Sequence, residues 1–182
     1  MAGRELFVGR ADLSVRQSIA QATANSGRRQ AHAFATGVSP YSITVDPPGQ
    51  VAYVTHLANA TGTAGSISAF TINSSTGVLS PVAGNPLAIP VSNYISIDPQ
   101  GKFLFVTEAV GVAVYPVNTS TGVLGTTAGG WPFAAGTSPY SVRIDPTGQF
   151  VYIGNDGSGN VSEFTLSSTG TLTPIAGMST GC

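Results

Sequence analysis

Hydrophobic and polar residues alternate with a period of two at three places along the chain. In the first, Tyr41, Ile43 and Val45 alternate with Ser42 and Thr44, and a similar order returns twice further on. This alternation is typical of β-strands with one buried face. Each stretch ends in Asp-Pro-x-Gly, which supplies a side-chain acceptor, a fixed φ and a flexible glycine. The sequence therefore predicts a tight turn and a second strand after each stretch, with the aspartate capping the turn.

The three stretches belong to a longer repeat. Its turn aspartates, Asp46, Asp98 and Asp145, lie 52 and 47 positions apart. After each turn come a second and a third apolar run and, behind a Ser-Thr-Gly sequence, a fourth. Four short strands joined by tight turns are the pattern of one propeller blade. The sequence thus predicts an all-β protein, a β-propeller of four-stranded antiparallel blades, with complete blades at about residues 37–87, 88–135 and 136–178.

Residues 1–36 fit an incomplete or degraded N-terminal blade. Residues 3–9 align with residues 148–154, which form the predicted second strand of the last repeat. The expected architecture is therefore three complete blades plus one incomplete N-terminal blade. Between residues 10 and 30 the pattern is compatible with a strand or with an amphipathic helix, because the Ser-Thr-Gly turn is missing there.

Charge is scarce and unevenly placed. Charged residues make up 8% of the chain, against about a quarter in an ordinary globular protein. Five of the seven Lys and Arg residues fall within residues 1–30, which leaves Lys102 and Arg143 against six carboxylates in the repeats. This pattern offers no basic track, so nucleic-acid binding is not expected. No apolar run approaches the roughly 20 residues of a membrane helix, so no membrane span is expected.

Metal, cofactor and disulfide chemistry find little support in the sequence. Cys182 is the single cysteine, so neither an intrachain disulfide nor a thiolate metal cluster is predicted. No metal site and no cofactor are expected. The compartment stays open: the chain as written suits the cytoplasm, and a leader upstream of it would make it extracellular or periplasmic.

The repeats resemble those of lactonase-type seven-bladed propellers, a family also known by its Tyr-Val-Thr-Asn repeat. The resemblance rests on Ser-Pro-Tyr-Ser, Asp-Pro-x-Gly-Gln and Ser-Thr-Gly-x-Leu, and it covers residues 37–178 closely and residues 3–36 loosely. It implies first strands that line a central channel. It also implies relatives such as 6-phosphogluconolactonases, together with surface or secreted propellers of unknown role. The chain has about half the length that the family implies.

Residues that depart from the repeat are the candidates for function, because a feature found in every blade is structural first. For a lactonase, His56 is the candidate general base, Glu108 its orienting or metal-binding partner, and Arg143 the cation that stabilises the oxyanion. The candidate ligand-binding residues lie along the predicted channel and its rim: Tyr41, Tyr94, Tyr140, Trp131, Asn155 and Asp156.

Two functions stay open at this point. The main hypothesis is a noncatalytic propeller module that acts as a binding or surface scaffold, with a small molecule or carbohydrate as ligand. The alternative is a lactonase-like hydrolase whose site forms at the loop rim of an assembled propeller. Half a propeller would expose apolar blade faces and strand edges, so we expect self-association, with a homodimer completing the ring. A closed four-bladed monomer is a second solution, and a truncated chain of low stability is a third.

Overall fold

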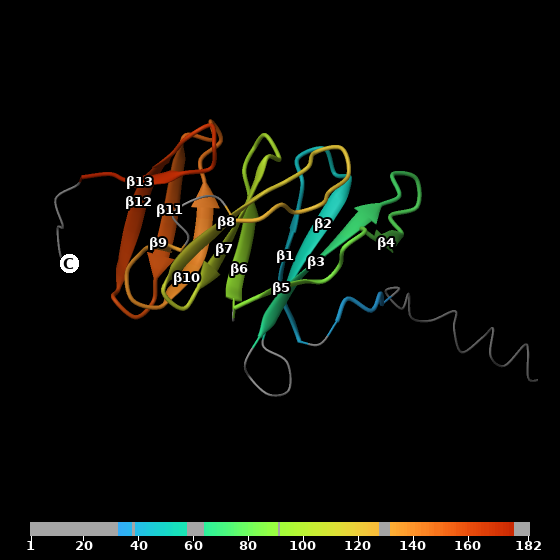
Figure 1. Ribbon diagram of the computed structural model, residues 1–182, viewed down its shortest axis with the longest axis horizontal. Coiled ribbons are helices and arrows are strands. Elements are labelled where there is room, and N and C mark those ends of the chain that lie inside the picture. Colours follow the sequence, from blue (N-terminus) through green and yellow to red (C-terminus); the bar gives the residue numbers. More distant parts are fainter. Residues whose placement is uncertain (1–32, 38, 58–63, 91, 128–131, 177–182) are drawn as a thin grey trace, which may run out of the picture. The chain divides into compact units, whose positions relative to one another are not determined.

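Three antiparallel sheets make up the described part of the protein (Figure 1). The computed structural model describes residues 33–37, 39–57, 64–90, 92–127 and 132–176. Blade 1 contains β1 (Pro40–Val45), β2 (Val51–His56), β3 (Gly65–Ile72), β4 (Leu79–Pro81) and β5 (Leu87–Ile89); blade 2 contains β6 (Ser92–Ile97), β7 (Phe103–Glu108), β8 (Gly111–Pro116) and β9 (Phe133–Ala134); blade 3 contains β10 (Pro139–Ile144), β11 (Phe150–Asn155), β12 (Asn160–Leu166) and β13 (Leu172–Pro174).

These sheets confirm the predicted propeller of four-stranded antiparallel blades. The strands of blade 3 pair in the order β10-β11-β12-β13, and β1 to β4 of blade 1 pair in the same way. The expected incomplete N-terminal blade, and the choice between strand and helix at residues 10–30, lie outside the described residues. Within the described ranges there is no helix long and apolar enough to cross a membrane.

Blade 2 departs from the expected pattern at its fourth strand. The segment after its Ser-Thr-Gly sequence forms only a single bridge, between Val117 and Leu124, where blade 1 has the three pairs of β3 with β4. The strand β9, which pairs with Gly111 and Val112, holds the register that β5 holds in blade 1 and does not take the place of this segment. The reason for the single bridge lies in Pro116. Its carbonyl accepts a hydrogen bond from the Gly125 amide at 2.8 Å, but a proline has no N–H and cannot donate one in return. The ladder loses one of its hydrogen bonds there, whereas blades 1 and 3 have threonines at the equivalent position.

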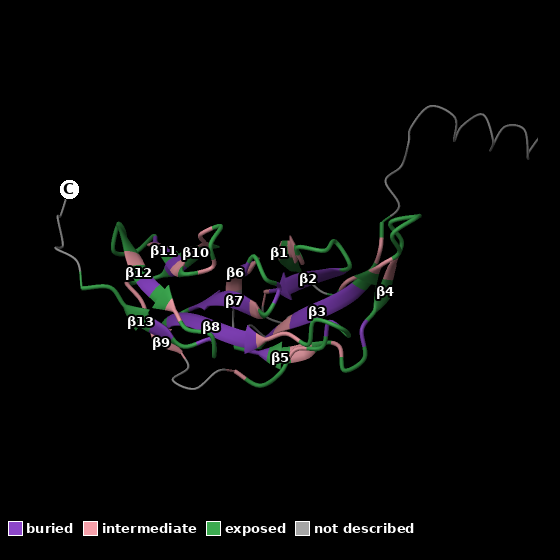
Figure 2. Ribbon diagram, turned by 90° about the horizontal axis from the view of Figure 1, so that it is seen from above, coloured by how far each residue is buried: buried purple, intermediate pink, exposed green. Residues whose placement is uncertain are grey.

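The apolar core lies between blades rather than within them. One cluster joins blades 1 and 2, where Tyr53 and Ile67 pack with Leu104 and other residues of blade 2. A second cluster joins blades 2 and 3, where Phe105 packs with Val142 and other residues of blade 3. Successive side chains of a strand point to opposite faces, so β7 and β8 supply one cluster from each face and are buried on both (Figure 2).

The outer faces of blades 1 and 3 expose residues whose inner equivalents are buried. Ile43 of β1 is 62% exposed, whereas Ile95, in the same register of blade 2, is 3% exposed. Val161 of β12 is 58% exposed, and its equivalent Val112 is fully buried. Exposed apolar faces of this kind are typical of surfaces that meet another blade or another protein. The expected self-association stays a prediction.

The three turn aspartates cap their turns, as predicted. The Asp46 carboxylate accepts from the amides of Gln50 and Val51 at 2.6 and 2.8 Å. Asp98, which is 1% exposed, accepts from the amide of Phe103 at 2.6 Å. Asp145 accepts from the amides of Gln149 and Phe150, both at 2.8 Å. A residue that repeats in this way in every blade is part of the scaffold.

Replacing the buried turn aspartate is expected to destabilise the fold. In Asp98→Ala the amides of Gln100 and Phe103 lose their acceptor, which costs about 1–3 kcal/mol of unfolding free energy when the donor is buried. Urea unfolding followed by circular dichroism measures the loss. Asp46→Ala is the matched control, with a smaller effect because its turn is more exposed. Equal losses in the two variants would contradict the explanation.

Asp145 gives the fold an acid-sensitive component. Hydrogen bonds from the Thr147 hydroxyl and then from the Phe150 amide lower the pKa of its carboxyl to about 2, from 3.8. The stabilisation is therefore complete above about pH 4 and is lost as the pH falls from about 4 to about 2, because the unfolded state takes up the proton first. Urea unfolding of the wild type and of Asp145→Asn between about pH 4 and about pH 2 checks this pH dependence. The wild type should lose more stability than the variant, and parallel curves would contradict the assignment.

Candidate functional site

The first strands of the three blades bring three tyrosine rings together. The hydroxyl of Tyr41 donates to the hydroxyl of Tyr140 at 2.9 Å, although the two residues are 99 positions apart. The ring centroid of Tyr94 lies 5.7 Å from that of Tyr41, nearly perpendicular to it, and 4.8 Å from that of Tyr140. Edge-to-face and tilted ring pairs at such distances are favourable. We call Tyr41, Tyr94 and Tyr140 the tyrosine cluster.

A β-bulge in each first strand places these tyrosines. In blade 1, Pro40 pairs with His56 and Ser42 with Thr55, so that Tyr41 and Ser42 together oppose Thr55. The same two-against-one register occurs in blades 2 and 3. A bulge bends the strand and re-aims its side chains. The repeat of this irregularity in every blade explains why side chains from three separate sheets meet.

In the sequence the three tyrosines look like one repeated series, but the strand register shows that their positions in the blades are not equivalent. Tyr41 and Tyr140 occupy the first bulge position, whereas Tyr94 occupies the second. A signal for this difference was present in the sequence, because Tyr94 is four residues before its turn aspartate and the other two are five before theirs. Because of this difference of one residue, the Tyr94 ring starts from a different bulge position than the rings of Tyr41 and Tyr140.

The hydroxyls of Tyr94 and Tyr140 remain protonated at neutral pH. The pKa of Tyr94 is raised, first by its hydrogen bond with Tyr140, and the positive charge of Arg143 opposes this increase. The pKa of Tyr140 is raised as well, first by its hydrogen bond with Tyr41, and the charge of Asp156 adds to the increase. Both phenols are therefore hydrogen-bond donors rather than bases in this site.

Three candidate residues occupy one structural position in three successive blades. His56, Glu108 and Asn155 each end the second strand and are 3%, 2% and 3% exposed. They are thus buried beside the first-strand ends that carry the tyrosine cluster. The same place in the scaffold holds an imidazole, a carboxylate and an amide, so it is here that the blades differ most in chemistry.

Their surroundings show what two of these side chains contact. The imidazole of His56 lies against Gly37, where an added Cβ would come within 2.8 Å of Cε1. Asn155 accepts from the Gly136 amide at 3.1 Å and donates to Asn160 Oδ1 at 2.9 Å. His56 and Asn155 therefore both meet the glycine of the segment that enters the first strand of their own blade.

The remaining candidates are more exposed. Arg143 lies in β10, donates from Nη1 to the Val142 carbonyl at 2.8 Å, and is close enough to affect the pKa of Tyr94. Asp156 follows β11 and affects the pKa of Tyr140. Trp131 lies outside the described residues. Among the described residues, no group of three or more His, Cys, Asp or Glu side chains is placed to hold a metal ion.

An open groove of about 410 Å³ adjoins the tyrosine cluster on blade 3. Three of the predicted ligand-binding residues line it, namely Tyr140, Asn155 and Asp156. The other lining residues are Ser141, Gly154, Gly159, Asn160 and Val161. A concave surface with a few convergent polar groups is typical of a small-molecule site.

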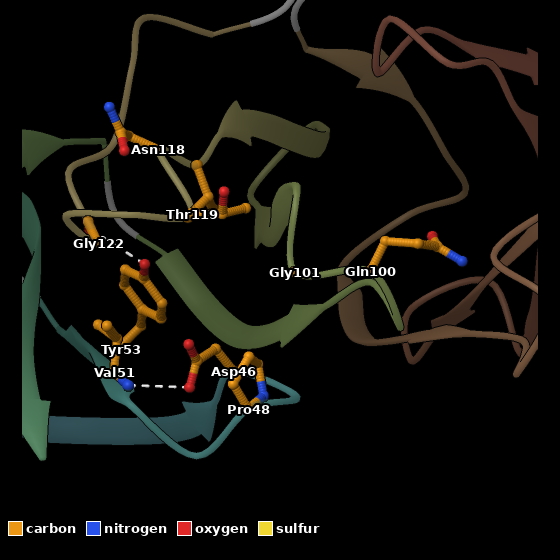
Figure 3. Close-up of a pocket in the computed structure, with 10 residues that line it drawn as sticks. Asp46, Pro48, Val51, Tyr53, Gln100, Gly101, Asn118, Thr119 and Gly122 are labelled. Atoms are coloured by element: carbon orange, nitrogen blue, oxygen red, sulfur yellow. Dashed lines mark hydrogen bonds between the residues drawn. The ribbon is translucent and has the colours of Figure 1, made fainter.

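A second, smaller pocket lies between the turns of blades 1 and 2 (Figure 3). It holds about 40 Å³, enough for roughly one or two water molecules. The hydroxyl of Tyr53 donates to the Gly122 carbonyl at 3.0 Å, and Asp46 accepts from the Val51 amide. Since these groups already serve the packing of the two blades, this pocket is not the candidate site.

Comparison with known proteins gives a family. The family model "Lactonase, 7-bladed beta-propeller" matches residues 5–128, which is more than half of the chain. No curated protein matches the chain. The family model agrees with the resemblance that the repeats indicated.

Solved structures agree in fold. A candidate 6-phosphogluconolactonase from Bacteroides fragilis is 25% identical, with a TM-score of 0.62, over 79% of this chain and 39% of its own. A second from Bacteroides uniformis is 22% identical, with a TM-score of 0.64, over 82% and 43%. The periplasmic gluconolactonase of Pseudomonas aeruginosa is 14% identical, with a TM-score of 0.52, over 75% and 53%. The chain therefore spans only about half or less of each of these structures.

These findings change the balance between the two functions left open by the sequence. The main hypothesis, a noncatalytic scaffold, gains no support from them. The family model agrees with the alternative, a lactonase-type propeller, and the solved structures agree with its fold.

The tyrosine cluster can be tested through its titration. In Tyr140→Phe, Tyr94 loses the hydrogen bond that is the largest cause of its raised pKa, so we expect the pKa of Tyr94 to fall towards 10. NMR titration of protein labelled with ¹³C-tyrosine measures it. Tyr152→Phe, which removes an exposed hydroxyl outside the cluster, is the control and should leave Tyr94 unchanged. An unchanged titration of Tyr94 in Tyr140→Phe would show that the two hydroxyls do not interact in solution.

Proposed function

The chain belongs to the lactonase family of seven-bladed β-propellers, and on this basis we propose that it forms part of a lactone hydrolase whose site lies at the tyrosine cluster. The observation that carries the proposal is the convergence of Tyr41, Tyr94 and Tyr140 from three separate blades, beside the groove of blade 3. Three phenol hydroxyls and their aromatic rings are brought to one place there by a bulge that each described blade repeats.

The chemistry of lactone hydrolysis fits such a site. Water adds to the ring carbonyl, the carbonyl oxygen becomes an oxyanion, and the ring C–O bond then breaks as the ring oxygen takes up a proton. The reaction needs a base for the water and donors for the oxyanion. The phenols of Tyr94 and Tyr140 are donors, and Arg143 supplies positive charge close to Tyr94.

The base is assigned to His56, with Glu108 as its orienting partner. A neutral imidazole accepts a proton near neutral pH, and a carboxylate favours the imidazolium that results. Both side chains are buried beside the strand ends that lead into the bulges. The imidazole of His56 also lies against Gly37, so the segment that contains Gly37 borders the proposed base.

Asp156 is a second candidate for the base, and one specific observation favours it. Its side chain is exposed, lines the groove and carries a charge that acts on Tyr140. An exposed carboxylate in this place is open to the water from which it would accept a proton. Separate substitutions of His56 and Asp156 distinguish the two assignments.

The remaining blades of a ring are part of the proposal. Since the chain spans 39% and 43% of the Bacteroides structures, a closed propeller needs blades beyond the three described here. A second copy of the chain is the source that we propose, because the outer faces of blades 1 and 3 carry the same kinds of apolar side chain that the inner interfaces bury.

Hydrolysis of sugar lactones tests the proposal. We expect the protein to hydrolyse δ-gluconolactone or its 6-phosphate faster than a buffer blank, and His56→Gln to lower kcat by about 10²–10⁴-fold if His56 is the base. Loss of lactone is followed by hydroxylamine trapping, with the mass in the same solution measured by light scattering. Tyr152→Phe is the control and should retain full activity.

The outcomes separate the parts of the proposal. A wild-type protein that is assembled and no faster than the blank on either lactone would reject the hydrolase function for these substrates. Activity that survives in His56→Gln and is lost in Asp156→Asn would move the base to Asp156. Activity that survives in both would reject both assignments.

A further inference from the structure

Thr107 contacts the backbones of two tyrosines of the cluster. It belongs to β7 of blade 2 and is fully buried. Its hydroxyl oxygen accepts from the Tyr94 amide at 2.9 Å within its own blade. The same oxygen lies 3.3 Å from the Tyr140 carbonyl of blade 3 and 3.4 Å from the Tyr94 carbonyl. A hydroxyl has one proton, so it donates to one of these carbonyls at a time while it accepts from the amide.

We infer that Thr107 is a positioning residue for the tyrosine cluster, because its one hydroxyl hydrogen-bonds the backbone at both of the bulges that carry Tyr94 and Tyr140. The inference deepens the proposed function. The part of the inference that concerns ligand binding rests on that function. The geometric part of it holds for the folded chain whether or not a lactone is the substrate.

The equivalent residues of the other blades show what is particular to Thr107. Thr55 of blade 1 also reaches across to the next blade, where its hydroxyl donates to the Asn93 carbonyl at 3.0 Å, and it lies 3.4 Å from the Ser42 carbonyl. Neither of its partners is a tyrosine. In blade 3 the equivalent residue is Gly154, which has no hydroxyl. Among the described blades, only blade 2 links two members of the cluster through one side chain.

The position of this link explains why it matters for the rings. A bulge leaves a residue outside the regular ladder, so its backbone is held less firmly than that of its neighbours. Tyr94 has its amide bonded to a side chain at this point. The separation of the Tyr94 and Tyr140 rings, 4.8 Å between centroids, therefore depends on a contact that also joins blade 2 to blade 3.

Other groups act on the same rings and must be kept constant. The charge of Arg143 acts on Tyr94, and those of Asp156 and the Tyr41 hydroxyl act on Tyr140. Replacing Thr107 changes none of these groups chemically. A change in the titration of the two rings would therefore report on their mutual placement.

The experiment compares Thr107→Val with Thr107→Ser in protein labelled with ¹³C-tyrosine. Valine keeps the volume and β-branch and lacks the hydroxyl, whereas serine keeps the hydroxyl. In Thr107→Val we expect the pKa of Tyr94 to fall towards 10 and the pKa of Tyr140 to rise, because their mutual hydrogen bond raises the first value and lowers the second. The ring shifts of both residues should change as well, and Thr107→Ser should restore the wild-type values. If the lactonase activity is present, kcat should fall several-fold in Thr107→Val with a smaller change in KM, since the two phenols are placed for the oxyanion, which forms only during the reaction, and Thr107 does not touch the substrate.

Ser68→Ala is the matched control. Ser68 is also buried, and its hydroxyl donates to the Thr36 carbonyl at 3.3 Å without contacting any tyrosine of the cluster. It should lower thermal stability and leave both titrations unchanged. If Thr107→Val behaves like Ser68→Ala, with a lower melting temperature and unchanged Tyr94 and Tyr140 signals, then Thr107 is only structural and the inference is wrong.

A measurement on the wild type covers the case in which Thr107→Val does not fold. The Tyr94 amide should be protected from hydrogen exchange, because it donates to a buried hydroxyl. Exchange at the rate of an unprotected amide would overturn the inference. Protection of this amide without any detectable lactone hydrolysis would reject the proposed function and leave the positioning role in place.

Discussion

Each blade of this protein is too thin to bury its own apolar residues, and the rest of the structure depends on that constraint. A four-stranded sheet has two faces, and the buried side chains of blade 2 are shared between clusters with blades 1 and 3. Stacked repeats gain their stability from such interfaces between neighbours. The relative placement of residues from different blades is therefore fixed by the same contacts that make the fold stable.

The candidate site follows from this arrangement. The tyrosine rings come from three sheets that share no strand, and they meet because the blades pack in sequence and each first strand has the same bulge. Hydrogen bonds from Thr55 and Thr107 to carbonyls of the following blade hold the first strands together near this point. Stability and site geometry thus share the same buried polar contacts, which are worth most where water is excluded.

The blades are alike in scaffold and unlike in chemistry. The turn aspartates and the apolar interface residues return in each repeat, and their hydrogen bonds and packing account for them fully. The position that ends each second strand holds His56, Glu108 or Asn155, although its place in the fold is the same. A repeat protein can acquire a single site in this way, by changing side chains at one position while the scaffold stays constant.

The sequence by itself determined the all-β class, the blade repeat, the turn caps and the family resemblance, because these depend on local alternation, on turn chemistry and on a period visible in one chain. It also found Tyr41, Tyr94 and Tyr140 as channel candidates. It did not find the bulge in each first strand, the reduction of the expected fourth strand of blade 2 to a single bridge, or the role of Thr107. These features depend on the pairing register and on which carbonyl of the next blade lies opposite a hydroxyl, and only the tertiary structure decides such contacts between residues far apart in the chain.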